Sequence, residues 1–485
     1  MNKKFIYIFS IGTLLFMSSC KEDNLRLLPE IGTPYEEAIN SEQDMKLVLA
    51  GVYTNMSSSS GFGAAVSIFG DLISDNTFVS NANDGYFLNT SRMTYSPEIS
   101  DFGMMDSFYD VIQQANIVIS DKKLPSSKTV LDYKAEAKIA RALSYFYLVS
   151  FYSPDPKTGV NQEYGVPIQP EVYYPNDKLA RASVGEVYDY IISDLQSAIS
   201  QLGSEVEPKR KSVLTPTAAK MLLSRVYLTR GAAGDYQKSV DYSNEVINSS
   251  PSNFAPIDSK ADYQNYFGGT SSAVMDDQPE TIFEIEQTSL FNVGGNAHPA
   301  TFYSNTGSHK SLLYRQTFVD TFEAADWRKS LFVTSGANQT PTGSGLDTPR
   351  GFYTKKWVRF TTDEGNYASN IRLMRFSEAY LNRIEAMFKM GSTAPALTYL
   401  NAFKSARGAA PVATITINEI LNERRKEFFA EGFRYFDLKR NAMPIVKDSN
   451  CTDNCNVSAD NRLFVIPIPY AEININSNMK QYPEW

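Results

Sequence analysis

The stretch ITINEILNERRKEFFAEGFRYFDLKRNAMPI, residues 415–445, contains the start and stop signals of a helix and sets the expectation for the fold. Thr416 and Glu419 stand at the spacing of a capping box, in which two side chains satisfy free backbone N–H groups at a helix start. Gly432 is placed to end the helix, because glycine readily adopts the left-handed conformation that follows a last turn. Apolar residues recur at helical spacing between these signals: Ile417, Ile420, Leu421 and Phe428. The stretch therefore predicts an amphipathic helix packed against a core.

Arg424 falls on this apolar stripe. A guanidinium that faces a core needs carboxylate partners, because a buried unpaired charge is strongly destabilising. The nearby candidates are Glu427, Glu431 and Asp437. We interpret these charges as a structural ion-pair network. A catalytic role is the alternative, but the network explains the charges without any chemistry.

Stretches upstream carry the same kinds of helix signal. Ser41 is placed as the N-cap of an apolar-patterned run, and Ser183 with Glu186 makes a second capping box. Thr215 is placed as an N-cap, with Pro216 in the first helical position, where proline is favoured. The helices predicted from these signals and from apolar spacing span residues 41–56, 104–123, 131–152, 183–202 and 215–231. The chain is therefore predicted to be mainly α-helical.

Two pairs of helical stretches have the design of a tetratricopeptide-like hairpin. Residues 215–231 and 234–250 are separated by a short turn, and the unit has about the 34 residues of that repeat. Residues 377–408 return to the same order of helix, glycine and helix. The two units are far apart in the sequence, so a regular solenoid is not predicted. Ordinary antiparallel helix pairs are the alternative interpretation.

Two long excursions interrupt the helical pattern. Residues 61–103 and 251–370 are rich in Gly, Ser, Thr and Asn with isolated aromatic residues, and helical periodicity fades in both. Long irregular loops and a few short strands are expected there. Loops of this length are usually functional or disordered, and the aromatic content argues against disorder. We expect one compact unit, in which a helical scaffold carries two functional excursions.

The N-terminus has the anatomy of an export signal. Lys3 and Lys4 precede an apolar run, residues 5–17, that is shorter than the roughly 20 residues of a membrane span. The small residues that follow, and then Cys20, resemble the lipobox of bacterial lipoproteins. Cys20 is therefore the predicted lipidation site, at which the signal peptide of residues 1–19 would be removed. Simple secretion is the alternative.

Composition limits the class of protein and the partners and cofactors that fit this chain. Hydrophobic residues make up 42% of the chain and charged residues 21%, which are ordinary values for a protein with a buried core. The net charge of −8 argues against nucleic acid as a partner. In an oxidising compartment Cys451 and Cys455 can form a local disulfide. No metal or cofactor is expected, because the only histidines, His298 and His309, lie far from these cysteines in sequence.

The helical motifs and the N-terminal signal together resemble the SusD/RagB family of outer-membrane, nutrient-binding lipoproteins. The matching pieces follow the family's order over nearly the whole chain, and their combination is far more specific than any single piece. They are AEAKIARALSYFYLVSFY (135–152), GVPI (165–168), LTPTAAKMLLSRVYLTRGAAGDYQKSVDYSNEVI (214–247), IRLMRFSEAYLNRIEAMFKMG (371–391), ILNERRKEFFAEGFRYFDLKR (420–440) and RLFVIPIPYAEININSNMKQYPEW (462–485).

The resemblance implies a SusD-like fold that sits as a lid on a SusC-like TonB-dependent transporter of the outer membrane. Such a protein captures a nutrient and has no enzymatic activity. Family members typically bind glycans, and a RagB-like branch binds peptides, which are the alternative ligand class. The charged residues directly after the anchor, Lys21, Glu22 and Asp23, resemble a surface-export signal and imply a position on the cell exterior.

The implied organisation has an N-terminal and a C-terminal region within one structural unit. The N-terminal region spans residues 20–250 and includes the excursion at 61–103. The C-terminal region spans residues 251–485. It contains the loop-rich segment 251–370 and helices at 371–445.

A glycan site needs aromatic faces for the sugar rings and polar groups for their hydroxyls. The resemblance places the binding loops in the two excursions without assigning single residues. The predicted ligand-binding residues are Asp75, Asn76, Asn83, Tyr86, Phe87, Tyr95, Phe291, Phe302 and Tyr303. A packing role beneath the loops is the alternative for each aromatic residue. Trp327 and Trp357 lie in stretches that resemble family framework and are predicted to be structural.

Two other classes of function stay open. Glycoside hydrolysis can run on two carboxylates, which a chain with 54 acidic residues can supply. Binding is favoured over catalysis because motifs such as G-x-S-x-G and H-E-x-x-H are absent from the sequence. A pure protein-interaction scaffold is the third class, because tetratricopeptide-like helices commonly bind proteins.

Overall fold

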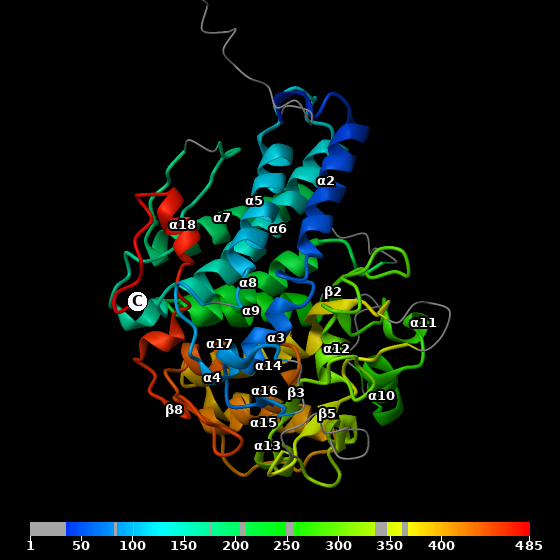
Figure 1. Ribbon diagram of the computed structural model, residues 1–485. Coiled ribbons are helices and arrows are strands. Elements are labelled where there is room, and N and C mark those ends of the chain that lie inside the picture. The colour runs from blue at the N-terminus through cyan, green and yellow to red at the C-terminus, as the bar shows by residue number, and fades with distance from the viewer. Residues whose placement is uncertain are drawn as a thin grey trace, which may run out of the picture.

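The computed structural model describes residues 35–81, 85–99, 101–174, 177–203, 210–248, 257, 259–334, 347–360 and 367–485. Predictions that rest on Cys20, on the signal peptide of residues 1–19 or on Asn83 lie outside these residues. The described chain is mainly helical with a few short strands, which confirms the predicted fold class (Figure 1).

Helices that follow one another in the chain pack side by side into one scaffold. They are α2 (Glu42–Met56), α5 (Met104–Ser120), α6 (Lys128–Tyr152), α7 (Val184–Leu202), α8 (Pro216–Arg230), α9 (Asp235–Asn248), α14 (Phe376–Lys389) and α15 (Thr393–Ser405). Each helix contacts the next one, from α2 through to α15. The predicted hairpins are α8–α9 and α14–α15, and contact between α9 and α14 joins them across the second excursion. In Figure 1, α2, α5 and α6 rise together at one end of the molecule.

The starts and ends of these helices follow local sequence signals. The Ser41 side chain accepts a hydrogen bond from a backbone N–H in the first turn of α2. Ser183 and Glu186 make both bonds of the predicted capping box at the start of α7. Thr215 caps α8, and Gly231 ends that helix with a φ of 62°. These bonds and the Gly231 conformation confirm the local predictions. Such features can be predicted from sequence because the residues that form them lie within about one helical turn of each other.

The signature stretch forms α16 (Ile417–Phe428) and α17 (Arg434–Arg440). Thr416 accepts a hydrogen bond from the Glu419 N–H at 3.1 Å, which is one half of the predicted capping box. Gly432 follows α16 with a φ of 79°. The helix buries its apolar stripe through Ile420, Leu421 and Phe428.

The first excursion contains more helix than the sequence predicted. It forms α3 (Ala65–Leu72), β1 (Thr77–Val79) and α4 (Leu88–Arg92), and all residues of α3 are buried. A Cβ atom on Gly70 of α3 would lie 1.9 Å from the carbonyl oxygen of Gly432, so only glycine permits this approach. The excursion is thus partly a core element that packs on the signature stretch.

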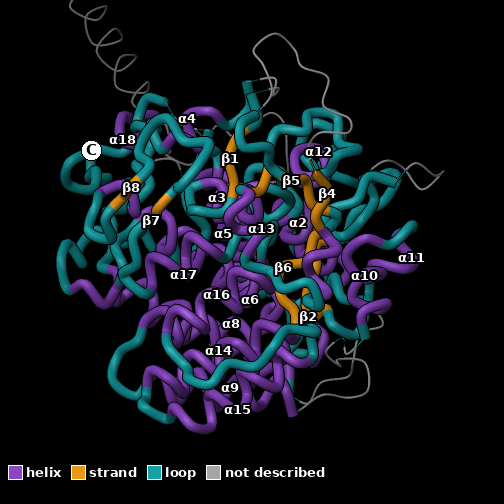
Figure 2. The backbone as a smooth tube through the Cα atoms, turned by 90° about the horizontal axis from the view of Figure 1, so that it is seen from below, coloured by secondary structure: helices purple, strands orange, loops and turns teal. Residues whose placement is uncertain are grey.

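Strands from both excursions form one antiparallel sheet with the order β1-β3-β5-β4. The strands of the second excursion are β3 (Leu312–Tyr314), β4 (Phe332–Thr334) and β5 (Phe352–Thr354). In the pair β1–β3, Thr77 faces Tyr314 and Val79 faces Leu312. Figure 2 shows β1, β5 and β4 gathered on one side of the molecule, away from α9 and α15. The sheet therefore joins two segments that are far apart in the sequence.

Shorter elements complete the described fold. They are α10 (Lys260–Gly268), α11 (Ser272–Met275), β2 (Thr281–Ile285), α12 (Pro299–Tyr303), α13 (Gln316–Asp320), β6 (Ile371–Arg375), β7 (Ile445–Val446), β8 (Asn456–Val457) and α18 (Tyr470–Ile475), with 3-10 turns η2 (Tyr35–Glu37), η3 (Pro156–Thr158), η4 (Trp327–Leu331) and η6 (Arg462–Phe464). Trp357 is buried, and its indole N–H donates to the Ala430 carbonyl at 2.7 Å, as expected for a structural tryptophan. Trp327 is partly buried against the same core.

Candidate functional site

The two excursions meet beside strands β1 and β3, and three of the predicted binding residues lie together there. Tyr86 and Phe87 directly precede α4, which contacts β1, and Phe302 belongs to α12, which contacts β3. The Phe302 ring centroid lies 5.5 Å from that of Tyr86 and 4.9 Å from that of Phe87. The fold thus assembles one group of rings from both excursions.

His309 is a fourth member of this group. Its ring centroid lies 4.3 Å from that of Tyr86 and 5.6 Å from that of Phe302. We call Tyr86, Phe87, Phe302 and His309 the aromatic cluster. Sequence reasoning did not select His309 as a binding residue. The signal that was available is its position shortly after Phe302 in the same glycine- and serine-rich segment.

Exposure differs among the members of the aromatic cluster. Phe302 is buried, whereas Tyr86, Phe87 and His309 are half-buried. Phe69 of the buried helix α3 packs against Phe87, with ring centroids 5.6 Å apart. A ring that is packed on one side and partly open on the other can stack on the apolar face of a sugar.

The backbone on both sides of α4 is in an unusual conformation. Phe87, at the start of the helix, has a φ of 59°, and Met93, just after its end, has a φ of 53°. Residues other than glycine seldom adopt this left-handed region, and such residues concentrate at binding and catalytic sites. Exposed polar residues flank the cluster in sequence, namely Asn89 on α4 and Ser308 before His309. Exposed polar residues are thus close to the rings in sequence.

Asp75 and Asn76 lie below the surface and bind arginines of the protein. Arg434 donates to the Asp75 carboxylate at 2.7 Å and 2.8 Å, and Arg425 donates to the Asn76 side-chain oxygen at 2.6 Å. Burial alone would raise the pKa of Asp75, but the charges of Arg425 and Arg434 outweigh it and hold the pKa well below its usual range. These two side chains hold the first excursion against α16 and α17.

Tyr303 and Tyr95 are also buried. The Tyr303 hydroxyl donates to the Ser67 carbonyl at 3.3 Å, and the Tyr95 hydroxyl donates to the Leu463 carbonyl at 2.6 Å. Tyr95 lines a cleft of about 510 Å³ together with Arg462 and Trp485. Arg462 lies over the Trp485 ring at 4.3 Å, and the Tyr95 ring lies 5.9 Å from it. Arg462 thus covers one face of the Trp485 ring.

Phe291 is the most exposed of the predicted binding residues that the structure describes. Its side chain is 81% exposed and that of the neighbouring Leu290 is 84% exposed. The two lie on a turn in which the Thr288 N–H donates to the Phe291 carbonyl at 2.8 Å. Phe291 therefore offers an open apolar ring outside the aromatic cluster. The remaining predicted residue, Asn83, lies outside the described residues.

Arg424 sits in a buried ion-pair network, as the sequence predicted, but with partly different partners. It donates to Asp437 at 3.0 Å and to the Asn382 side chain at 2.8 Å, and it lies 3.6 Å from Glu385. Of the predicted partners, Asp437 is confirmed, whereas Glu427 and Glu431 bind other cations. Helix spacing did not reveal these other cations because they come from distant segments.

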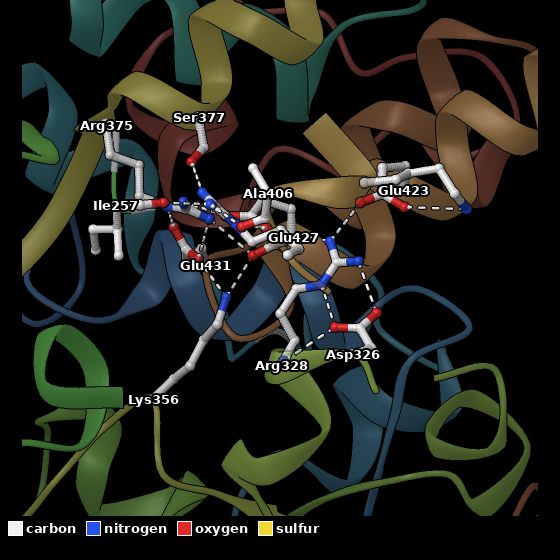
Figure 3. Close-up of polar contacts among 12 residues, drawn as sticks. Ile257, Asp326, Arg328, Lys356, Arg375, Ser377, Ala406, Glu423, Glu427 and Glu431 are labelled. Atoms are coloured by element: carbon white, nitrogen blue, oxygen red, sulfur yellow. Dashed lines mark hydrogen bonds and ion pairs between the residues drawn. The ribbon is translucent and has the colours of Figure 1, made fainter. Parts of the chain in front are cut away.

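Glu427 lies at the centre of a second group of buried charges (Figure 3). It accepts hydrogen bonds from Arg375 at 2.7 Å, from Arg328 at 3.2 Å and from Arg407 at 3.2 Å. Burial alone would raise the pKa of Glu427, but the surrounding arginines outweigh it and hold the pKa well below its usual range. These groups are saturated by one another and are closed to solvent, so the network holds the fold together.

The sequence left open whether Cys451 and Cys455 pair, and the structure shows that they do. Cys451 and Cys455 form a disulfide whose Cα atoms are 5.8 Å apart. Among the described residues, no group of His, Cys, Asp and Glu side chains is arranged to hold a metal ion. None of the helices in the described part of the chain is long and apolar enough to cross a membrane.

Two family models match the sequence. Residues 300–485 match the model described as SusD family, and residues 27–228 match a model described as starch-binding associating with outer membrane.

Individual proteins agree with these matches. A SusD-like protein of Bacteroides ovatus is 25% identical over 69% of this chain and 64% of its own length, so the chain spans slightly less than two thirds of it. The starch-binding protein SusD of Bacteroides thetaiotaomicron is 23% identical, over 77% of this chain and 76% of that protein. The crystal structure of a SusD superfamily protein from Bacteroides thetaiotaomicron is 27% identical. It superposes with a TM-score of 0.81, covering 92% of this chain and 100% of that one.

Proposed function

The chain belongs to the SusD family, and we propose that it captures a glycan at the cell surface and delivers it to a TonB-dependent outer-membrane transporter. In this proposal Cys20 carries the lipid anchor, the helical scaffold binds the SusC-like transporter, and the two excursions hold the ligand. The family description that names starch binding and the outer membrane supports this proposal.

The observation that carries the glycan proposal is the aromatic cluster. Its rings come from both excursions, and Tyr86 stays partly open above His309 at a ring distance of 4.3 Å. We propose Tyr86 and Phe87 as the stacking residues, with Phe302 as their support. Phe291 and Asn83 stay proposed contacts on neighbouring loops. The other predicted binding residues are bonded within the protein, and we propose that they shape the site: Asp75, Asn76, Tyr95 and Tyr303.

Binding is proposed in place of catalysis. The buried carboxylates of the signature stretch, such as Glu427, are saturated by arginines and are closed to solvent, so they cannot reach a glycosidic bond. The starch-binding relative is named for what it binds. Peptides are the second ligand class, because the exposed apolar side chains of Phe291 and Leu290 can also contact peptide side chains.

Calorimetric titration tests the proposal directly. The mature chain with Cys20 replaced by Ser would be titrated with maltoheptaose, with laminarihexaose and with a tryptic peptide mixture. We expect binding of a neutral oligosaccharide that weakens roughly five-fold in Tyr86→Ala, because one stacking contact contributes about 1 kcal/mol. Tyr399→Ala is the matched control, since Tyr399 is an exposed tyrosine on α15. Binding of peptides alone would favour the second ligand class, and binding of neither class would contradict the proposal.

A further inference from the structure

The disulfide lies at the tip of a hairpin that contains none of the proposed ligand-binding residues. Strands β7 and β8 form its base, where Ile445 and Val457 pair and are both buried. Cys451 and Cys455 close the tip of the connection between the two strands. We call residues 445–457 the disulfide hairpin. Its base is fixed in the core, so its tip has a defined position.

The disulfide hairpin binds the carbonyl groups at the C-terminal end of α4. The last carbonyls of any helix lack acceptor partners within the helix and need donors from elsewhere. Lys447 donates from Nζ to the Ser91 carbonyl at 2.7 Å. Asn454 donates from Nδ2 to the carbonyls of Arg92 and Met93, each at 3.0 Å. Three successive backbone carbonyls are thereby bound by one hairpin.

Helix α4 depends on such contacts for its position. It has only 5 residues, so it spans roughly 7–8 Å and is far too short to be stable by itself. Left-handed residues flank it at both ends, Phe87 and Met93. Thr90 donates to the Asp101 side chain at 2.5 Å near the middle of the helix. The C-terminal end is bound to the hairpin, and the N-terminal end carries Tyr86 and Phe87.

The disulfide encloses the residue that makes two of these bonds. Asn454 lies within the ring that Cys451 and Cys455 close, and its backbone has a φ of 47°, a conformation that asparagine tolerates better than most residues. With the backbone in this turn, the Asn454 carboxamide reaches α4. Lys447 lies outside the ring, next to β7, and its bond to Ser91 does not require the disulfide.

We propose that the disulfide hairpin is a positioning element of the glycan site. Through Asn454 and Lys447 it fixes α4, and α4 fixes Tyr86 and Phe87 in the orientation that binds the sugar. This inference rests on the proposed function for its effect on the ligand, but the effect on α4 can be measured without any ligand. Because the ring closed by the disulfide is short, its loss should destabilise the folded protein less than the loss of a disulfide that closes a long loop.

Hydrogen exchange measures how readily the backbone of α4 opens, and therefore how firmly its contacts hold it. The Ser91 and Met93 amides bond to the carbonyls of Phe87 and Thr90 within the helix. In Cys451→Ser/Cys455→Ser and in Asn454→Ala, peptides covering these amides should exchange on the order of tenfold faster, because two hydrogen bonds to α4 are lost. Asn456→Ala is the matched control, since Asn456 is exposed and lies on the same hairpin. Unchanged exchange in both variants would overturn the inference.

Titration with maltoheptaose and laminarihexaose gives the second readout. Both hairpin variants should weaken binding about three- to ten-fold, and the loss should be smaller when Tyr86→Ala is already present, because the hairpin then positions only one of the two stacking rings. A purely stabilising disulfide would instead lower the melting temperature and leave binding of the folded protein intact, and this outcome would overturn the inference. If Tyr86→Ala loses binding and the hairpin variants do not, the proposed function stands and the inference fails. If the wild-type protein binds neither sugar, the proposed function fails, and the exchange rates alone decide whether the hairpin positions α4.

Discussion

Replacement of Glu427 by glutamine tests the interpretation of the buried charges as a structural network. The substitution keeps the size of the side chain and one hydrogen-bond acceptor but removes the charge. Arg375 would retain Glu431 at 2.7 Å, and Arg328 would retain Asp326 at 2.8 Å. Arg407 would lose its hydrogen-bonded carboxylate, because among the described residues only Glu427 accepts its hydrogen bonds as an anion.

The expected loss follows from the burial of Arg407. Its side chain is buried beside the rings of Phe403 and Tyr263, at 4.9 Å and 5.1 Å, so water cannot replace the lost anion. Breaking a buried pair by removing one partner costs about 3–5 kcal/mol. We therefore expect Glu427→Gln to lower the free energy of unfolding by about 4 kcal/mol. Adding Arg407→Met should restore part of this loss, because methionine removes the unpaired charge and suits the apolar surroundings.

Urea denaturation followed by circular dichroism gives these free energies. Glu245→Gln is the matched control, because Glu245 pairs with Lys220 at 3.1 Å on the surface, where its side chain is 50% exposed. Its loss should stay below about 1 kcal/mol. A loss below about 1 kcal/mol for Glu427→Gln would refute the reasoning. So would a double variant less stable than Glu427→Gln alone. Loss of sugar binding in a fully stable Glu427→Gln would show that the network does more than support the fold.

Three further predictions concern pH, the anchor and the partner. Burial raises the pKa of Glu284 to about 7, so the native state holds a proton that the unfolded chain has lost, and stability should fall as pH rises from about 4.5 to about 7. Glu284→Gln should reduce this pH-dependent fall in the free energy of unfolding by about 3 kcal/mol, measured by urea denaturation at several pH values. An unchanged pH dependence would contradict the raised pKa of Glu284. Metabolic labelling with a fatty acid should mark the wild-type protein and not Cys20→Ala, and equal labelling would exclude Cys20 as the anchor. Gentle solubilisation should recover a TonB-dependent barrel with this protein, since a large interface survives such treatment, and recovery of the protein alone would count against the partnership.

Local signals made much of the scaffold predictable from the sequence. Ser41, Ser183 and Thr215 start helices because an N-cap acts on backbone groups only a few residues away. Helix α3 was missed because it has only 8 residues, too few to establish a helical period, and its polar side chains are buried together with the apolar ones. Its tight contact with Gly432 depends on two segments that no local pattern connects.

The candidate site was predictable only in part. Tyr86, Phe87 and Phe302 lie in one cluster. The sequence predicted Tyr303 and Tyr95 as binding residues on the same grounds, but the fold buries both. Which ring reaches the surface depends on the pairing of β1 with β3, and this pairing joins segments far apart in the chain. The sequence alone therefore located the two segments and could not rank the rings within them.

The most direct test of the central claim is a crystal structure of the protein with the oligosaccharide that binds best in the titrations. We predict a sugar ring stacked on Tyr86 at about 4 Å, beside Phe87 and between α4 and α12. Sugar found only elsewhere, for example in the cleft that Arg462 and Trp485 line, would contradict the assignment of the aromatic cluster as the glycan site.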